Sequence, residues 1–188
     1  MSKTCVFITG TNCTGKSTLA KELIARFGGI DSVSRTLTSC KNGLVCFAGR
    51  YDLTKRYGGV DGFNSTKVLA DVVLEGLQAH EVIVCEGSYF HTIGLNLTNA
   101  MFEAEQQLVV YLYAPAETLN ARLLERSGKP LTPVMASKQK QCCVAARKWQ
   151  QMGVPVLSFD TSQVTPPNIA DAVIKKIEQL CGETMTAR

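Results

Sequence analysis

Short apolar runs and amphipathic stretches alternate along most of the chain. Apolar runs that are rich in β-branched residues and bounded by turn residues are typical of strands buried on both faces. Five such runs predict strands, over residues 3–9, 44–48, 81–85, 107–113 and 154–159. The stretch between the first helical pattern and about Phe63 is otherwise irregular, and only the run at 44–48 predicts regular structure there.

Apolar residues spaced three and four positions apart predict helices between these strands. Capping and turn residues set several of their limits: Gly28 stops the first helix, Asn64 or Ser65 caps the second, and Gly128 closes the third. The predicted helices cover residues 17–27, about 65–77, 115–126, 132–152 and 167 onward.

This alternation of strands and helices predicts the fold class. Parallel strands need a crossover connection, which is usually a helix. We therefore expect an α/β fold in three layers, with a parallel sheet of about five strands and helices on both faces. Ligands of such sheets bind at the carboxyl ends of the strands, an edge that here holds Gly10, Glu86 and Ala114.

Length and composition fit one domain of a soluble globular protein. The 188 residues are 45% hydrophobic and 19% charged, and no composition break marks a linker. The longest unbroken apolar run, residues 108–115, is far shorter than the ~20 residues that span a bilayer. The first ten residues lack the pattern of a secretory signal. We expect a cytoplasmic protein that makes no membrane contact.

The eight cysteines form no C-x-x-C pair, and the two histidines, His80 and His91, lie far from any cysteine pair. Several of the cysteines lie inside apolar runs, where Cys behaves as a small hydrophobe. Free thiols are therefore expected in preference to disulfides or a metal site.

The positive charge of the chain is concentrated in one segment. Residues 35–67 contain six Lys or Arg against two Asp, so this segment carries the whole formal charge of +4. A solvated basic loop is one interpretation. Beside a phosphate site, the same charge favours an acidic ligand.

The most specific motif in the sequence is GTNCTGKST, residues 10–18. It contains the pattern G-x-x-x-x-G-K-[ST] between a predicted strand and a predicted helix. Glycines let successive N–H groups point inward at oxygen anions, and the helix adds its positive end. Lys16 supplies a charge for the β- and γ-phosphates, and the Ser17 hydroxyl can bind Mg²⁺. We expect a nucleoside triphosphate site made of Gly10, Thr11, Asn12, Cys13, Thr14, Gly15, Lys16, Ser17 and Thr18.

A second candidate lies where another predicted strand ends. Glu86 follows the apolar run 81–85 and precedes Gly87. An acid at this edge can hold Mg²⁺ through water or accept a proton from the group that receives a phosphoryl. The alternative is an acid that faces solvent.

Other motifs separate the classes of proteins with a phosphate loop. The chain has neither the N/T-K-x-D motif of GTPases nor an L-S-G-G-Q-like signature of ABC-type ATPases. The segment QLVVYLYAPAETLNARLLERSGKPLT resembles the fourth strand and lid region of the P-loop kinase superfamily. The resemblance implies that Arg122 and Arg126 neutralise the transferring γ-phosphoryl group. The alternative is a charged outer helix face, with the arginines paired to Glu117 or Glu125.

The resemblance also divides the single domain 1–188. It implies a core of residues 1–29, 64–126 and 135–188, an acceptor-binding insert at about 30–63, and a short lid at about 127–134. Gly58 to Gly62 form a predicted tight turn that carries Asp61, our first candidate for the general base, followed by Asp52 and Glu86. A turn aspartate that bonds its own backbone is the competing interpretation.

Aromatic and basic residues alternate in the insert. Tyr51, Tyr57 and Phe63 interleave with Arg50 and Arg56, a mixture that can stack a base and hold a phosphate, or that can pack as an ordinary loop. The expected substrate-binding residues are Arg35, Arg50, Tyr51, Asp52, Arg56 and Asp61.

The stretch GRYDLTKRYGGVDGF resembles bacteriophage kinases that phosphorylate 5-hydroxymethyluracil within DNA. That resemblance implies ATP and Mg²⁺ as cofactors, DNA as the acceptor, and the cytoplasm of the host cell as the location. A nucleoside or nucleoside-monophosphate kinase is the main alternative, and a nucleotide-binding regulator without turnover is a lesser one. The sequence leaves the oligomeric state open, with a homodimer as one option.

Overall fold

The computed structural model describes residues 2–51, 59–60, 63, 65–87 and 95–182. Within them, one sheet has the strand order β2-β3-β4-β5-β1-β6-β7. The strands are β1 (Thr4–Thr9), β2 (Ile30–Val33), β3 (Leu37–Cys40), β4 (Val45–Ala48), β5 (Val82–Glu86), β6 (Gln106–Tyr113) and β7 (Val156–Asp160). The helices are α1 (Lys16–Arg26), α2 (Thr66–Ala79), α3 (Leu95–Phe102), α4 (Ala116–Ser127), α5 (Pro133–Gln151) and α6 (Pro166–Cys181).

Five strands, from β4 to β7 in the sheet order, pair in parallel, which confirms the expected α/β fold. The strands β2 and β3 were not predicted. They add an antiparallel extension beside β4, within a stretch that was expected to be irregular. The helix α3 was not predicted either.

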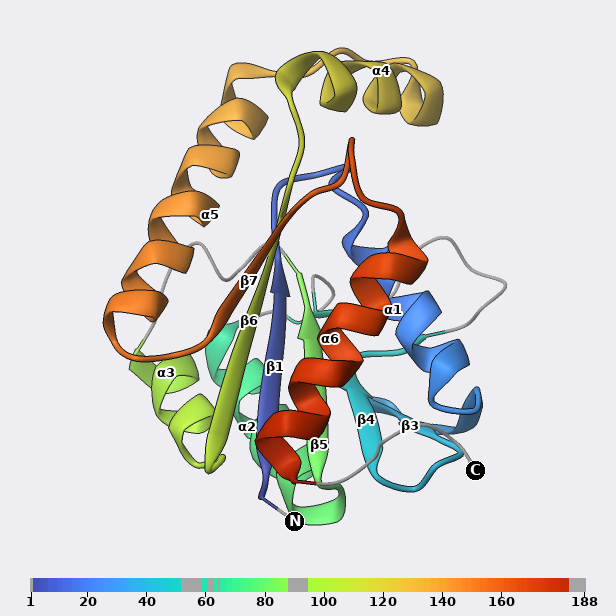
Figure 1. Cartoon of the computed structure of the whole chain (residues 1–188), viewed down its shortest axis with the longest axis vertical. Coiled ribbons are helices and arrows are strands. Elements are labelled where there is room, and N and C mark those ends of the chain that lie inside the picture. Colours follow the sequence, from blue (N-terminus) through green and yellow to red (C-terminus); the bar gives the residue numbers. More distant parts are fainter. Residues whose placement is uncertain (1, 52–58, 61–62, 64, 88–94, 183–188) are drawn as a thin grey trace.

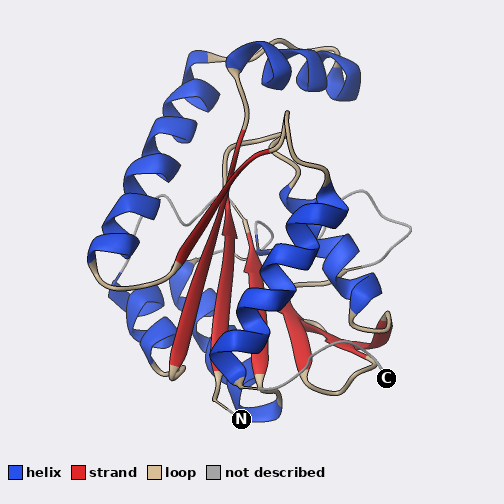
Figure 2. Cartoon of the chain, viewed as in Figure 1, coloured by secondary structure: helices blue, strands red, loops and turns tan. Residues whose placement is uncertain are grey.

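Helices cover both faces of the sheet (Figure 2), and the alternation of side chains along β1 shows why. Val6 and Ile8 point into a core shared with α1 and α6. Cys5 and Phe7 point into a second core, which contains residues of α2 and α3 and Trp149 of α5. Because the two faces of one strand serve two cores, the strand reads as a continuous apolar run.

Capping residues place several helix ends where the sequence predicted them. Ser65 caps α2 by accepting a hydrogen bond from the Val68 amide at 3.2 Å, which decides between Asn64 and Ser65. Thr132 caps α5 in the same way, from the Met135 amide at 3.3 Å. The C-cap Gly128 of α4 is left-handed, with φ 66°, as a closing glycine requires.

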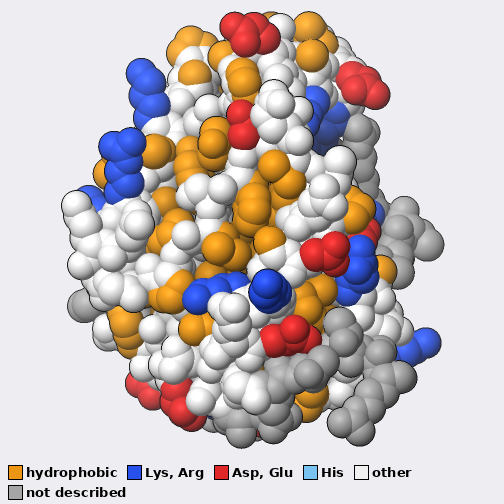
Figure 3. Space-filling view, viewed as in Figure 1, with side chains coloured by type: hydrophobic (Ala, Val, Ile, Leu, Met, Phe, Trp, Pro, Cys, Tyr) orange, Lys and Arg blue, Asp and Glu red, His pale blue; other side chains and the backbone are white. Residues whose placement is uncertain are grey.

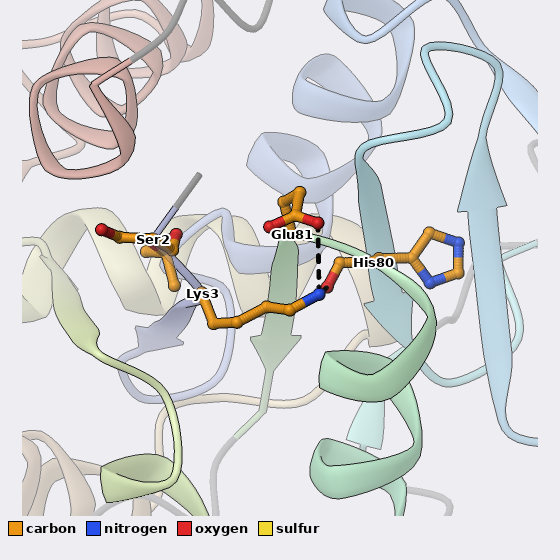
Figure 4. Close-up of polar contacts among 5 residues, drawn as sticks. Ser2, Lys3, His80 and Glu81 are labelled. Atoms are coloured by element: carbon orange, nitrogen blue, oxygen red, sulfur yellow. Dashed lines mark hydrogen bonds and ion pairs between the residues drawn. The ribbon is translucent and has the colours of Figure 1, made fainter.

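Lys3 joins two neighbouring strands at the amino-terminal edge of the sheet (Figure 4). Its ammonium donates to the His80 carbonyl at 2.9 Å and to the Glu81 carboxylate at 3.2 Å. Because both charged side chains are about one third exposed, the ion pair contributes at most about 1 kcal/mol. The contact fixes β1 beside β5 at this end.

All eight cysteines are free thiols, as the sequence predicted. Burial raises the pKa of the Cys40 thiol to about 12 and raises that of Cys46 further. These thiols act as small core side chains. Among the described residues, no helix is both long and apolar enough to cross a membrane.

Candidate functional site

The phosphate loop joins β1 to α1 at the carboxyl edge of the sheet (Figure 1). Cys13, with φ 61°, is the one non-glycine residue with a positive φ in the described part of the chain. Gly10 is required for a different reason, because a Cβ there would collide with the Leu112 carbonyl and the Thr14 hydroxyl. The loop is therefore curled, as the motif predicted, and the structure adds that it packs closely against β6.

The first turn of α1 presents its amides at the cleft. Its N-cap is Gly15, which has no side chain to cap the helix, and the first turn contains no acidic residue. Helix N-termini leave backbone N–H groups without partners inside the helix and carry a partial positive charge. An anion such as a phosphate would satisfy these amides.

Lys16 is held inside the same loop. Its side chain is buried, with 7% of the residue exposed, and its ammonium donates to the Thr11 carbonyl at 3.0 Å. Thr11 in turn donates from its hydroxyl to the Met135 carbonyl at 2.9 Å, which links the loop to the start of α5. The charge of Lys16 is thus kept at the cleft by the loop itself.

Glu86 lies against the phosphate loop, as its position at a strand end predicted. The residue is 3% exposed, and its carboxylate accepts a hydrogen bond from the Ser17 hydroxyl at 3.0 Å. A hydroxyl and a carboxylate are hard oxygen donors, the type that Mg²⁺ prefers, and Mg²⁺ is commonly held by one or two carboxylates together with phosphates. The donor set of Ser17 and Glu86 therefore fits Mg²⁺.

Tyr51 occupies a different place from the one expected. Its ring is buried, with 1% of the residue exposed, and packs edge-on against Phe47 with 5.4 Å between ring centroids. The Tyr51 hydroxyl donates to Glu86 Oε2 at 3.1 Å. The ring is therefore not available to stack a base, and the packed-loop interpretation describes Tyr51 correctly.

The two arginines of α4 both reach Cys13, but in different ways. Arg122 donates to the Cys13 carbonyl at 3.2 Å, to the Thr161 hydroxyl at 2.9 Å and to the Thr161 carbonyl at 2.6 Å. Arg126 is exposed, and its guanidinium lies 3.7 Å from the Cys13 sulfur. Arg122 therefore ties the phosphate loop to the end of β7, while Arg126 extends over the loop from α4.

One cleft of about 1060 Å³ brings most of these residues together. The residues predicted from sequence that line it are Asn12, Cys13, Thr14, Gly15, Lys16, Ser17, Thr18, Arg35, Arg50, Glu86, Arg122 and Arg126. Arg35, in the turn between β2 and β3, and Arg50, which follows β4, are both exposed. The cleft is thus lined by cations from the phosphate loop, from α4 and from the insert.

Several expected site residues lie outside the described residues. Asp52, Arg56 and Asp61 are among them, as is Tyr57. Their roles stay predictions.

Two contributors to the site were not predicted from the sequence. Thr161 anchors Arg122, and the run Asp160-Thr161-Ser162, which begins at the last residue of β7, would have pointed to this carboxyl edge. Gly59 lies against Glu86, so that a Cβ on Gly59 would collide with the carboxylate. No short sequence motif predicts that Gly59 lies against Glu86, because the two residues belong to segments that are separate in the sequence.

A basic surface begins at the rim of the cleft. Met135, in the first turn of α5, lines the cleft, and the rest of α5 carries four cations and no acidic residue. These cations are Lys138, Lys140, Arg147 and Lys148. Figure 3 shows Lys and Arg side chains on the side of the molecule where Figure 1 places α5.

No protein-family model and no curated protein sequence matches the chain. Solved structures do match over nearly its whole length. The YorR protein of Bacillus subtilis, solved in complex with phosphorylated GDP, has a TM-score of 0.63 at 16% identity, covering 95% of this chain and 98% of that one. A sugar kinase from Janibacter sp. HTCC2649 has a TM-score of 0.57 at 12% identity, covering 99% of both chains.

Shikimate kinase from Acinetobacter baumannii, solved with shikimate, has a TM-score of 0.52 at 14% identity, covering 94% of this chain and 93% of that one. At these identities the likeness concerns the fold. The chain, with its mostly parallel seven-stranded sheet, therefore shares the α/β fold of these solved kinases.

Proposed function

We propose that this protein is an ATP-dependent kinase that transfers a γ-phosphoryl group to a hydroxyl of a nucleic-acid-related acceptor. The observation that carries the proposal is one cleft that is lined by cations from several elements. Lys16 of the phosphate loop, Arg126 of α4, and Arg35 and Arg50 of the insert all line it. A triphosphate and a second anionic molecule both find positive partners there.

Phosphoryl transfer requires mainly that the protein position the reactants and neutralise the phosphate charge. The acceptor oxygen attacks the γ-phosphorus, the bond from that phosphorus to the β-phosphate bridging oxygen breaks, and ADP leaves. The proton of the acceptor hydroxyl passes to a carboxylate, for which Asp61 is our first candidate and Asp52 and Glu86 are the next. Lys16 and the amides of α1 would hold the phosphates, and Arg126 would meet the charge that develops on the γ-phosphoryl group.

Mg²⁺ is the second cofactor of the proposal. Ser17 and Glu86 would hold it, and when bound it would neutralise phosphate charge. Arg122 would act indirectly, by keeping the phosphate loop and the segment after β7 in register around the nucleotide.

Our first candidate for the acceptor is the 5-hydroxymethyl group of 5-hydroxymethyluracil in phage DNA. It is supported by the resemblance of the insert and by its excess of basic residues. The cations of α5, which begins at the rim of the cleft, also suit a polyanion longer than the cleft itself.

A nucleoside or nucleoside monophosphate is the second candidate acceptor. One observation favours it: the structure of YorR, which matches this fold, was solved with phosphorylated GDP. Arg35 and Arg50 would suit the phosphate of a small nucleotide equally well. A regulator that binds nucleotide without turnover is the third option, and it predicts binding of ATP with no labelled acceptor.

One labelling panel separates these options. The protein is incubated with γ-labelled ATP and, separately, with DNA containing 5-hydroxymethyluracil, ordinary DNA, free nucleosides, and each nucleoside monophosphate. We expect label in the 5-hydroxymethyluracil DNA and not in ordinary DNA. Label in a nucleoside or nucleotide alone would replace the DNA acceptor, and no label in any lane would contradict the kinase.

A further inference from the structure

The carboxylate of Glu86 is shared by two segments that are distant in sequence. Oε1 accepts a hydrogen bond from Ser17, at the start of α1, and Oε2 accepts one from Tyr51, which follows β4. The residue is buried, so the orientation of the carboxylate depends on protein partners more than on water. Orientation matters here because Oε1 is the oxygen that lies beside the Ser17 hydroxyl.

Tyr51 is itself fixed at both ends. Its amide donates to the Thr38 hydroxyl at 2.9 Å, and that hydroxyl donates to the Gly49 carbonyl at 2.9 Å. Its ring packs against Phe47 in the hydrophobic core that also contains residues of α1 and α6. The phenol oxygen is therefore presented to Glu86 by a buried, hydrogen-bonded scaffold.

The backbone of two glycines also lies close to the Glu86 carboxylate. Gly59 approaches Glu86 so closely that a Cβ would strike the carboxylate, and Gly49 approaches Gly59 in the same way. The space around Oε2 is thus bounded by glycine backbone as well as by the Tyr51 hydroxyl. A side chain in such a position orients the ligand of a cofactor without touching the cofactor.

We propose that Tyr51 is a positioning residue that holds Glu86 in the orientation with which it and Ser17 bind Mg²⁺. The inference rests on the proposed function, because it concerns the same nucleotide site. It adds a residue whose role is exerted through Glu86. Tyr51→Phe removes the hydroxyl and keeps the buried ring, so it tests the hydrogen bond with little change in packing.

The test measures nucleotide affinity by calorimetry, with Mg²⁺ present and with Mg²⁺ removed by EDTA. In the wild-type protein, Mg²⁺ should strengthen ATP binding. In Tyr51→Phe we expect the affinity for ATP with Mg²⁺ to fall about 10-fold or more, the usual effect of losing an outer partner of a metal ligand, with metal-free ATP binding unchanged. The control is Tyr111→Phe, which removes a hydroxyl that donates to the Gln139 carbonyl at 3.4 Å.

Glu86→Gln completes a double-mutant cycle. If Tyr51 acts through Glu86, adding Tyr51→Phe to Glu86→Gln should weaken binding with Mg²⁺ no further. An equal loss with and without Mg²⁺ would mean that the hydroxyl serves only the fold, and an additive loss in the double variant would mean that it acts elsewhere. Either result would overturn the inference.

The binding measurements need no turnover. A wild-type protein that labels no acceptor would therefore contradict the proposed function while leaving the role of Tyr51 open to this test. Conversely, unchanged Mg²⁺-dependent binding in Tyr51→Phe would overturn the inference while leaving the kinase intact.

Discussion

The hydroxyl of Ser17 donates to the carboxylate of Glu86 across 3.0 Å, and this hydrogen bond joins the first turn of α1 to the end of β5. Two neighbouring parallel strands, β1 and β5, thereby bring a phosphate loop and an acid together. The pair is the kind of oxygen-donor set that a nucleotide-bound Mg²⁺ requires.

Lys16→Ala should abolish phosphoryl transfer without unfolding the chain. Loss of a preorganised charge at a transferring group typically costs on the order of 10²–10³-fold in rate. The side chain also donates to the Thr11 carbonyl from a buried position, so the variant should lose some stability but keep its fold. Lys175→Ala, on the exposed side of α6, is the control, and a wild-type rate in Lys16→Ala would discredit the site.

Asp61→Asn tests the proposed general base. A base of this kind contributes about 10²–10⁴-fold, so turnover should fall far more than ATP affinity does. Steady-state kinetics and calorimetry on the same preparation would separate the two effects. Unchanged turnover would transfer the role to Glu86 or Asp52.

The two arginines of α4 should behave differently when each is replaced by Ala. Arg122→Ala removes three hydrogen bonds to Cys13 and Thr161, so it should lower the free energy of unfolding, on the order of 1.5–3 kcal/mol for a charged donor. Arg126→Ala should leave stability nearly unchanged and lower kcat. Denaturant titration with single-turnover kinetics would show this split, and an equal loss of stability in both variants would refute it.

Gly59→Ala should damage the site through Glu86. The residue has φ 88°, a conformation that costs an alanine about 1 kcal/mol or more, and the added Cβ collides with the carboxylate. We expect a lower melting temperature and weaker binding of ATP in the presence of Mg²⁺. Gly43→Ala is the control, because it has φ 71° and nothing within 4 Å of the added Cβ. Equal losses of Mg²⁺-dependent binding in both variants would show that the approach of Gly59 to Glu86 is unimportant.

The basic face of α5 should matter for a polymer acceptor and not for a small one. Replacing Lys140, Arg147 and Lys148 with Gln should weaken DNA binding and reduce the slope of log affinity against log salt by about 0.9 for each phosphate that the variant no longer neutralises. Anisotropy with labelled DNA measures this, and Lys175→Gln with Lys176→Gln on α6 is the control. A salt slope unaltered by the triple variant would remove α5 from the acceptor surface.

The fold could be predicted from the sequence where the buried residues of a strand form an apolar run, which β3, with the sequence LTSC, does not. The strands β1, β5 and β6 are buried nearly throughout and therefore read as apolar runs. The strand β2 could not be read in this way, because Asp31, Ser32 and Val33 are all exposed at the edge of the sheet. The strand β2 is defined by its antiparallel pairing with β3. Such pairing leaves no pattern of hydrophobic residues in the sequence of β2 itself.

The residues of the candidate site also differ in how far the sequence could predict them. The phosphate loop and Glu86 were identified because loop spacing and a strand end are local features. The hydrogen bond of Tyr51 to Glu86 spans 35 residues, and that of Arg122 to Thr161 spans 39. Contacts of this kind depend on which strands are neighbours. The sequence therefore identified Tyr51 and Arg122 as site residues but not their hydrogen-bond partners Glu86 and Thr161.

Calorimetry of ATP binding in the presence of Mg²⁺ tests the central claim most directly, since every other step requires a triphosphate in the phosphate loop. We predict measurable binding heat with the wild-type protein and its loss in Lys16→Ala, with the fold of the variant retained. Absence of heat with both ATP and GTP in the wild-type protein would contradict the account.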